Sequence, residues 1–289
     1  LVTTSAGLEE GVIDSSEYIN CIGTFDKLDH PRCWIARETG GEHGPLNTAG
    51  AIEQSCNFYF YEVGYRLSLN ENGEYDAERG LAMLRKYAEK YGFGEKSGVE
   101  VAENLSQIST EYPATSAIGQ GTNNYTTSQL ARYVTTIANK GTLFDLTLLN
   151  KTTDVKGNVI EESQPKIDNT LSDISASTWD AVHEGMRNVV LVSHSSTFSD
   201  INRSGFQLSG KTGTAQQSKT HPDHALFIGF APSDSPEVAF ATRIANGYSS
   251  TYAAEVARDV MKYYYQLTPE NELITGTASS IGSNASNEG

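Results

Sequence analysis

The stretch that most constrains the fold is residues 208–215, Leu-Ser-Gly-Lys-Thr-Gly-Thr-Ala. Residues 205–212 match the phosphate-loop pattern G-x-x-x-x-G-K-T, which needs a buried strand before it and a helix opening at the Lys-Thr pair. Residues 199–204 are too polar for a buried strand, and Gly213 and Pro222 oppose a helix after Thr212. The pattern therefore predicts a strand and argues against a nucleotide-binding loop.

A strand of this kind has two interpretations. Gly213 would let a substrate backbone lie close along it, and a free strand edge can pair with an extended peptide. An ordinary strand with an exposed lysine explains the same residues equally well. The residues of this stretch alone do not decide between them.

Apolar residues at helical spacing predict a mostly helical region before this strand. Asp76 is the expected N-cap of one helix, and Thr126 with Gln129 forms an expected capping box for another. The expected helices are a segment ending near Glu10, then residues 49–54, 58–67, 76–91, 126–140 and 179–189. A polar hairpin is expected within residues 152–165, turning at 156–158.

The period of the apolar residues changes after the Lys-Thr-Gly stretch. Residues 224–230 form an apolar run and residues 238–244 alternate, so both are predicted strands, followed by a helix over 253–264. We expect a domain over 1–266, with a mainly helical lobe at 1–204 and a sheet portion with a closing helix at 205–266. Residues 267–289 are predicted to be a disordered polar tail.

Composition and charge exclude several classes of function. A net charge of −15 in 289 residues argues against nucleic acid or an anionic membrane face as a partner. No run has the apolar length of a membrane span, and no signal peptide is visible. No cofactor and no metal are expected, because Cys21 and Cys33 lack C-x-x-C spacing and a His at zinc-site spacing. His183-Glu184 also lacks the second His of H-E-x-x-H.

Several motifs in a fixed order carry a family resemblance. They are Ser55-Cys56-Asn57 as S-x-N, the landmark at 117–121 with 129–141, Lys211-Thr212-Gly213, and the run 224–232. In this order, and with flanks such as residues 33–34 and 41–44, the chain resembles the transpeptidase domain of class B, elongation-type penicillin-binding proteins. The resemblance runs from residue 1 to about 266. It implies an α/β (α+β) fold of the β-lactamase/transpeptidase type, in which an antiparallel sheet is flanked by helices and a helical lobe. The first strands of that sheet would be missing from this chain.

One signature of that family, S-x-x-K with the nucleophilic serine, is not matched in its place. The only S-x-x-K here is Ser163 to Lys166, which lies between the other motifs and contains Pro165, so we interpret it as a chance match in a loop. The first residues of the chain resemble the remainder of the helix that this motif opens. The resemblance therefore places the nucleophile immediately before Leu1.

The resemblance implies acyl transfer from a D-Ala-D-Ala stem peptide through a serine acyl-enzyme, which cross-links peptidoglycan. Ser55 would relay protons, Asn57 would hold the substrate amide, and Lys211 would set the positive potential. Thr212 and Thr214, beside Gly213, would hold the terminal carboxylate, with the Thr214 N–H in the oxyanion hole. Strict strand alternation puts Lys211 and Thr212 on opposite faces, so both reach one site only at a twisted sheet edge.

The implied partners are stem peptides, β-lactam antibiotics and cell-wall synthesis proteins. The implied location is outside the cytoplasm, in a parent protein anchored to the membrane by a segment not in this chain. Two other classes stay open. One is a catalytically inactive binding or regulatory module, and the other is a β-lactamase or penicillin sensor.

Three structural and chemical expectations follow from the resemblance. Cys21 and Cys33 should be near each other, either as a disulfide or as two free thiols. The strand at 237–244 should lack a neighbour on one side, which leaves an edge open to upstream residues or to self-association. The 289-residue chain should form no covalent adduct with penicillin.

Overall fold

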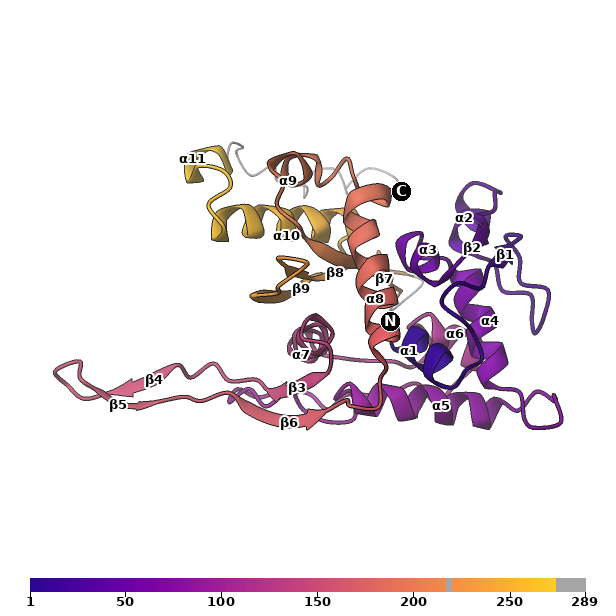
Figure 1. Cartoon of the computed structure of the whole chain (residues 1–289), viewed down its shortest axis with the longest axis horizontal. Helices are drawn as coiled ribbons and strands as arrows, with labels where there is room; N and C mark the ends of the chain where they lie inside the picture. Colours follow the sequence, from indigo (N-terminus) through magenta and orange to yellow (C-terminus); the bar gives the residue numbers. More distant parts are fainter. Residues whose placement is uncertain (217–219, 274–289) are drawn as a thin grey trace.

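A computed structural model describes residues 1–216 and 220–273. A three-stranded antiparallel sheet lies between a helical lobe and a second helical layer, and a narrow two-stranded arm projects from the lobe (Figure 1). The expected combination of an antiparallel sheet with a large helical part is confirmed.

The sheet has the order β7-β8-β9 and carries the Lys-Thr-Gly stretch on its first strand. Alternation along β8 places Phe227 in the core under α10, whereas Phe230 belongs to the core of the helical lobe. Lys211 lies opposite Ile228, and Thr214 opposite Ala225. The elements here are β7 (Ser209–Ala215), β8 (His224–Ala231), β9 (Val238–Ile244), α9 (Ser199–Ser204) and α10 (Ser250–Tyr264).

The helical lobe is built around a short buried helix, α1, whose residues from Thr3 to Gly7 are all buried. A side chain at Gly185 would lie 2.6 Å from Ile52 Cβ, so α8 and α3 pack in close contact. The helices of the lobe are α1 (Val2–Glu9), α3 (Thr48–Glu53), α4 (Asn57–Leu67), α5 (Ala77–Lys90), α6 (Pro113–Ala117), α7 (Thr127–Ala138) and α8 (Ala176–Asn188), which continues as a π-turn, Val189–Ser193.

Three two-stranded sheets complete the lobe and its arm. β1 (Ile19–Cys21) pairs with β2 (Gly44–Leu46), with α2 (Trp34–Glu38) between them in sequence. The arm consists of β3 (Thr142–Asp145) paired with β6 (Lys166–Thr170), then β4 (Lys151–Thr153) paired with β5 (Val159–Glu162) (Figure 1). Its turn runs from Asp154 to Asn158, so the predicted polar hairpin is confirmed.

The predicted helices and their caps are confirmed where local signals were strong. Asp76 Oδ1 accepts from the N–H groups of Glu78 and Arg79, and the capping box of Thr126 and Gln129 forms. Several elements were not predicted, among them α2, α6, β1, β2, β3 and β6. Residues 199–204 form the helix α9, and α11 (Glu270–Leu273) lies within the segment that was expected to be disordered. The rest of that segment, 274–289, lies outside the described residues.

The far edge of the sheet is as predicted. Within the described residues β9 pairs only with β8, so its other edge has no strand neighbour. Among these same residues, no helix has both the length and the apolar character that a membrane crossing requires.

Candidate active site

The S-x-N triplet is the joint between α3 and α4. Ser55 follows the end of α3 and has a left-handed φ of 49°, which is uncommon for a residue other than glycine. Cys56 is the N-cap of α4, where its Sγ accepts from the Tyr59 N–H at 3.5 Å. Trp34 Nε1 donates to the Gln54 carbonyl at 3.0 Å, which fixes the chain just before Ser55. The strained backbone of Ser55 is therefore held from both sides.

Lys211 joins the Lys-Thr-Gly strand to this triplet. Its Nζ donates to Ser55 Oγ and, at 2.8 Å, to the Thr212 carbonyl. Burial lowers the pKa of Lys211 from 10.5 to about 8, because a charged amine is disfavoured away from water. An amine with this pKa exchanges protons readily near neutral pH.

Strand alternation would place the side chains of Lys211 and Thr212 on opposite faces, yet both reach one site. Lys211 Nζ lies 3.5 Å from Thr212 Oγ1, so both side chains reach the same site. This agrees with the position of β7 at an edge of the described sheet. The structure thus brings Ser55, Lys211 and Thr212 together.

The other predicted site residues lie along the same two elements. Gly213 faces Leu226, since an added Cβ would lie 3.2 Å from Leu226 Cβ. Thr214 is exposed, and its carbonyl accepts from Gln120 Nε2 at 3.0 Å. Asn57 is the first residue of α4.

Sequence reasoning assigned no role to two residues near this site. Gln120 belongs to the quoted landmark at 117–121, and its contact with Thr214 ties that loop to β7. His194 follows the π-turn, next to Ser193, whose Oγ donates to the Glu53 carbonyl at 3.1 Å. Burial, and after it the charge of Lys211, lower the pKa of His194. No sequence motif marks His194.

The start of α1 also approaches Lys211. The charge of Lys211 acts on the backbone nitrogen of Leu1, the first residue of this sequence. The chance S-x-x-K lies elsewhere: Lys166 Nζ bonds Asp145 Oδ2 at 2.5 Å on the arm, and the Ser163 N–H donates to the Asn150 carbonyl. Ser163 is not in a helix, so its interpretation as a loop residue is confirmed.

A cluster of three cysteines and a histidine adjoins the triplet. Cys21 ends β1, Cys33 is the N-cap of α2, His43 precedes β2, and Cys56 caps α4. One ligand atom from each lies within 4.8 Å of all the others. The argument from spacing did not find this cluster, because the four residues meet in space although no two have a metal-site spacing in sequence.

The cysteines of this cluster are near each other but not bonded. Cys21 Sγ and Cys33 Sγ each lie 3.6 Å from His43 Nδ1, and all three cysteines are free. The predicted proximity of Cys21 and Cys33 is therefore confirmed, and of the two alternatives the structure has the free thiols.

The donor set of the cluster fits a soft divalent cation. Three sulfurs and one imidazole nitrogen are the Cys₃His set of structural zinc sites. Hydrogen bonds with Cys21 and Cys56 lower the pKa of the Cys33 thiol, whereas hydrogen bonds with Cys21 and Cys33 raise the pKa of the Cys56 thiol. His43 Nε2 is buried without a hydrogen-bond partner, so only Nδ1 is committed to the sulfurs. The types of these ligand atoms and their closeness, within 4.8 Å of one another, are those that a Zn²⁺ site needs.

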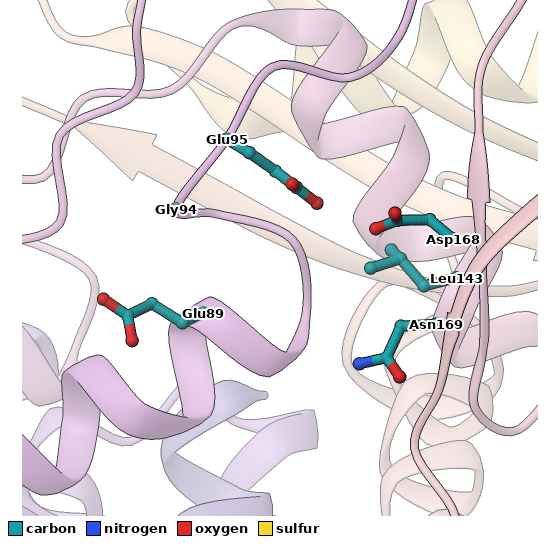
Figure 2. A pocket seen from close by; sticks show the side chains of 6 residues that line it. All are labelled: Glu89, Gly94, Glu95, Leu143, Asp168 and Asn169. Atoms are coloured by element: carbon teal, nitrogen blue, oxygen red, sulfur yellow. The ribbon is translucent and has the colours of Figure 1, made fainter.

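A separate cavity of about 440 Å³ lies between the C-terminal part of α5 and strands β3 and β6. Figure 2 shows its lining, Glu89, Gly94, Glu95, Leu143, Asp168 and Asn169. The buried Arg132 bonds Glu95 at 2.8 Å and Asp168 at 2.9 Å, so it neutralises part of this acidic lining. None of the residues around Ser55 and Lys211 lines it, and we assign it a structural role.

Comparisons with known proteins agree with this geometry. Residues 1–262 match the family model described as the penicillin binding protein transpeptidase domain. The chain is 28% identical to the peptidoglycan D,D-transpeptidase MrdA of Acinetobacter baumannii, over 92% of this chain and 41% of the relative. It is also 28% identical to penicillin-binding protein 2B of Streptococcus pneumoniae, over 93% and 42% respectively.

Solved structures give the same result. Penicillin-binding protein 2B from Streptococcus pneumoniae strain R6 superposes with a TM-score of 0.77 at 26% identity, covering 93% of this chain and 47% of that one. PBP2 of Pseudomonas aeruginosa in complex with WCK 5153 gives a TM-score of 0.72 at 27% identity, with 96% and 61% covered. The chain thus spans about two fifths of the length of the curated relatives above, and the predicted transpeptidase fold is confirmed. This chain belongs to the penicillin-binding protein transpeptidase domain family.

Proposed function

We propose that this domain is the catalytic part of a serine-type peptidoglycan D,D-transpeptidase. The observation that carries the proposal is the contact between Lys211 Nζ and Ser55 Oγ, which joins the K-T-G strand to the S-x-N triplet. Acyl transfer needs a nucleophile, a proton relay and donors for the oxyanion. We propose the boundaries 1–266 for this part of the domain.

The residues have the following roles in this proposal. The nucleophilic serine belongs to an S-x-x-K motif upstream of Leu1, on the side of α1 that approaches Lys211. Lys211, with its pKa near 8, holds the Ser55 hydroxyl, which passes a proton to the leaving amine. Asn57 binds the substrate amide, and Thr212 and Thr214 bind the terminal carboxylate beside Gly213. The Thr214 N–H donates to the oxyanion.

Substrates, partners and location are proposed from the relatives. The MrdA relative is named a peptidoglycan D,D-transpeptidase, and other relatives are named for penicillin binding, so we propose D-Ala-D-Ala stem peptides and β-lactams as ligands. A structural neighbour is described as part of a peptidoglycan synthase complex, which supports cell-wall synthesis proteins as partners. Peptidoglycan lies outside the cytoplasm, so the parent protein acts there and is anchored to the membrane.

Intact-protein mass spectrometry after incubation with benzylpenicillin tests this function. The 289-residue chain should carry no covalent adduct, and a longer chain that includes the preceding residues should carry one. An adduct on the shorter chain would show that the nucleophile has been misplaced. No adduct on the longer chain would favour an inactive binding module, and rapid loss of its adduct would favour a β-lactamase.

We propose, second, that Cys21, Cys33, His43 and Cys56 bind one Zn²⁺. The observation behind this proposal is that four soft ligand atoms lie within 4.8 Å of one another in a mostly buried cluster. Zinc would act as a structural cross-link between β1, the loop before β2, α2 and α4.

Metal analysis of the chain purified with and without added ZnCl₂ tests this second proposal. One zinc per chain is expected, and the variant His43→Gln should lose it. His221→Gln is the matched control, because it removes an exposed histidine far along the sequence. A chain that binds no zinc, or an unaffected H43Q variant, would refute the proposal.

A further inference from the structure

The three sulfurs of the cluster have two chemical fates that exclude each other. They can remain thiolates on a metal, or two of them can form a disulfide, because their ligand atoms already lie within 4.8 Å of one another. We infer that zinc occupancy decides which fate occurs, and that the disulfide is formed by Cys21 and Cys33. This inference rests on the zinc site proposed above.

The pairing follows from what each sulfur does in the fold. Cys56 Sγ accepts the Tyr59 N–H as the N-cap of α4, so a bond through Cys56 would remove a helix cap. Cys33 stands at the N-cap of α2, but its side chain accepts no capping hydrogen bond there, and Cys21 lies on a strand. Both are hydrogen-bonded to the same nitrogen, His43 Nδ1, at 3.6 Å. Their bond would leave Cys56 and His43 as two ligands, which is too few for a structural zinc site.

Access to these sulfurs requires the short strand pair β1 and β2 to open. Cys21 and Cys33 are buried, so an oxidant does not reach them in the closed structure. However, Cys21 lies on β1, whose only strand partner among the described residues is β2, and each strand has three residues. An isolated two-stranded sheet is marginally stable in water. Its opening would expose Cys21 and move His43, which directly precedes β2, unless zinc holds both ends together.

The redox step balances with a small disulfide such as oxidised glutathione. The thiolate of one cysteine attacks a sulfur of the reagent, breaks its S–S bond and releases one reduced thiolate. The second cysteine then attacks the protein sulfur of the mixed disulfide and releases the other. The two protein sulfurs lose two electrons, the reagent gains two, and the protons of the two cysteines pass to the released thiolates. When zinc is bound, it has to leave before the second attack.

The consequence reaches the active site through the triplet. Zinc cross-links Cys56, between Ser55 and Asn57, to β1 and α2. In the disulfide state Cys56 keeps its helix cap but loses that cross-link. Loading with zinc during folding would therefore fix the triplet, whereas folding without zinc under oxidising conditions would leave it tethered only through α3 and α4.

The test uses the chain after reduction and removal of metal. One half receives one equivalent of ZnCl₂, both halves are exposed to oxidised glutathione, and free thiols are alkylated after denaturation. Mass spectrometry should find three alkylated cysteines in the zinc-loaded half. The metal-free half should show one alkylated cysteine, Cys56, and a linked Cys21–Cys33 peptide. MgCl₂ in place of ZnCl₂ should give no protection.

Two variants make the result decisive. His43→Gln keeps all three sulfurs but should form the disulfide even with zinc present, whereas Cys33→Ser should form no Cys21–Cys33 peptide. A metal-free chain that keeps three thiols, or that links Cys56 instead, would overturn the inference. If the chain binds zinc but oxidises equally with it, only this inference fails. If metal analysis of the same samples finds no bound zinc and no protection, the zinc proposal fails too.

Discussion

Replacing Lys211 with methionine should make the folded chain more stable at neutral pH and remove a pH dependence. Burial lowers the pKa of Lys211 from 10.5 to about 8. One pKa unit is worth about 1.4 kcal/mol, so holding the charged amine in this site costs about 3 kcal/mol. Methionine carries no charge and has a similar length.

The sign of the pH effect follows from where each state releases its proton. Below pH 8 the amine is protonated in both states, and the folded state bears the full cost. Between pH 8 and 10.5 the folded state loses its proton while the unfolded state keeps it, so stability rises with pH. Above 10.5 both are neutral. The wild type should therefore gain about 3 kcal/mol relative to Lys211→Met between pH 7 and 11.

At pH 7 the difference in unfolding free energy between the variant and the wild type is smaller than this change of about 3 kcal/mol. The methionine variant also loses the hydrogen bonds from Lys211 to Ser55 Oγ and the Thr212 carbonyl, at roughly 1 kcal/mol each. A net gain of about 1 kcal/mol for the variant is expected at pH 7. Urea unfolding followed by circular dichroism, at pH steps from 7 to 11, measures the difference. Other groups that titrate there cancel between the two proteins. A difference independent of pH would show that Lys211 has an ordinary pKa.

Further substitutions probe the packing and the sheet edge. Arg132→Met should cost about 3–5 kcal/mol in urea unfolding, because the buried guanidinium bonds Glu95 and Asp168, whereas the exposed Arg85→Met should cost under about 1. Gly185→Val should lower stability by about 1–3 kcal/mol or more, since its Cβ would meet Ile52; a melting temperature like that of wild type would contradict this. The open edge of β9 and the exposed Val256 and Val260 on α10 should let the chain self-associate. In sedimentation velocity, Val256→Glu should weaken this association, and the control variant Glu255→Gln should weaken it less.

Much of the helical lobe was predictable because its signals are local. The cap at Asp76 and the capping box at Thr126 each depend on residues within one turn, so the sequence alone contains the whole interaction. The strand at Lys211 was also predictable, since Gly213 and Pro222 oppose the helix that a phosphate loop needs. The helix α9 was not, because its residues are polar and only Ile201 is buried.

The cluster beside the triplet could not be predicted from spacing. Its ligands are contributed by β1, the N-cap of α2, the loop before β2 and the N-cap of α4, and only the packing of these elements brings them together. The contact of Gln120 with Thr214 is of the same kind, since its partners are separated by 94 residues. Such contacts depend on tertiary structure, and a search for fixed spacings in one sequence does not test them.

The left-handed backbone at Ser55 connects these observations. A non-glycine residue in this region costs on the order of 1 kcal/mol, so its neighbours have to hold it there. Trp34 fixes the carbonyl of Gln54 on one side, and the Cys56 cap fixes the start of α4 on the other. Trp34 also packs edge to face against the ring of His43 at 5.3 Å. The groups that hold Ser55 against Lys211 are thus also the groups that surround the cysteine cluster.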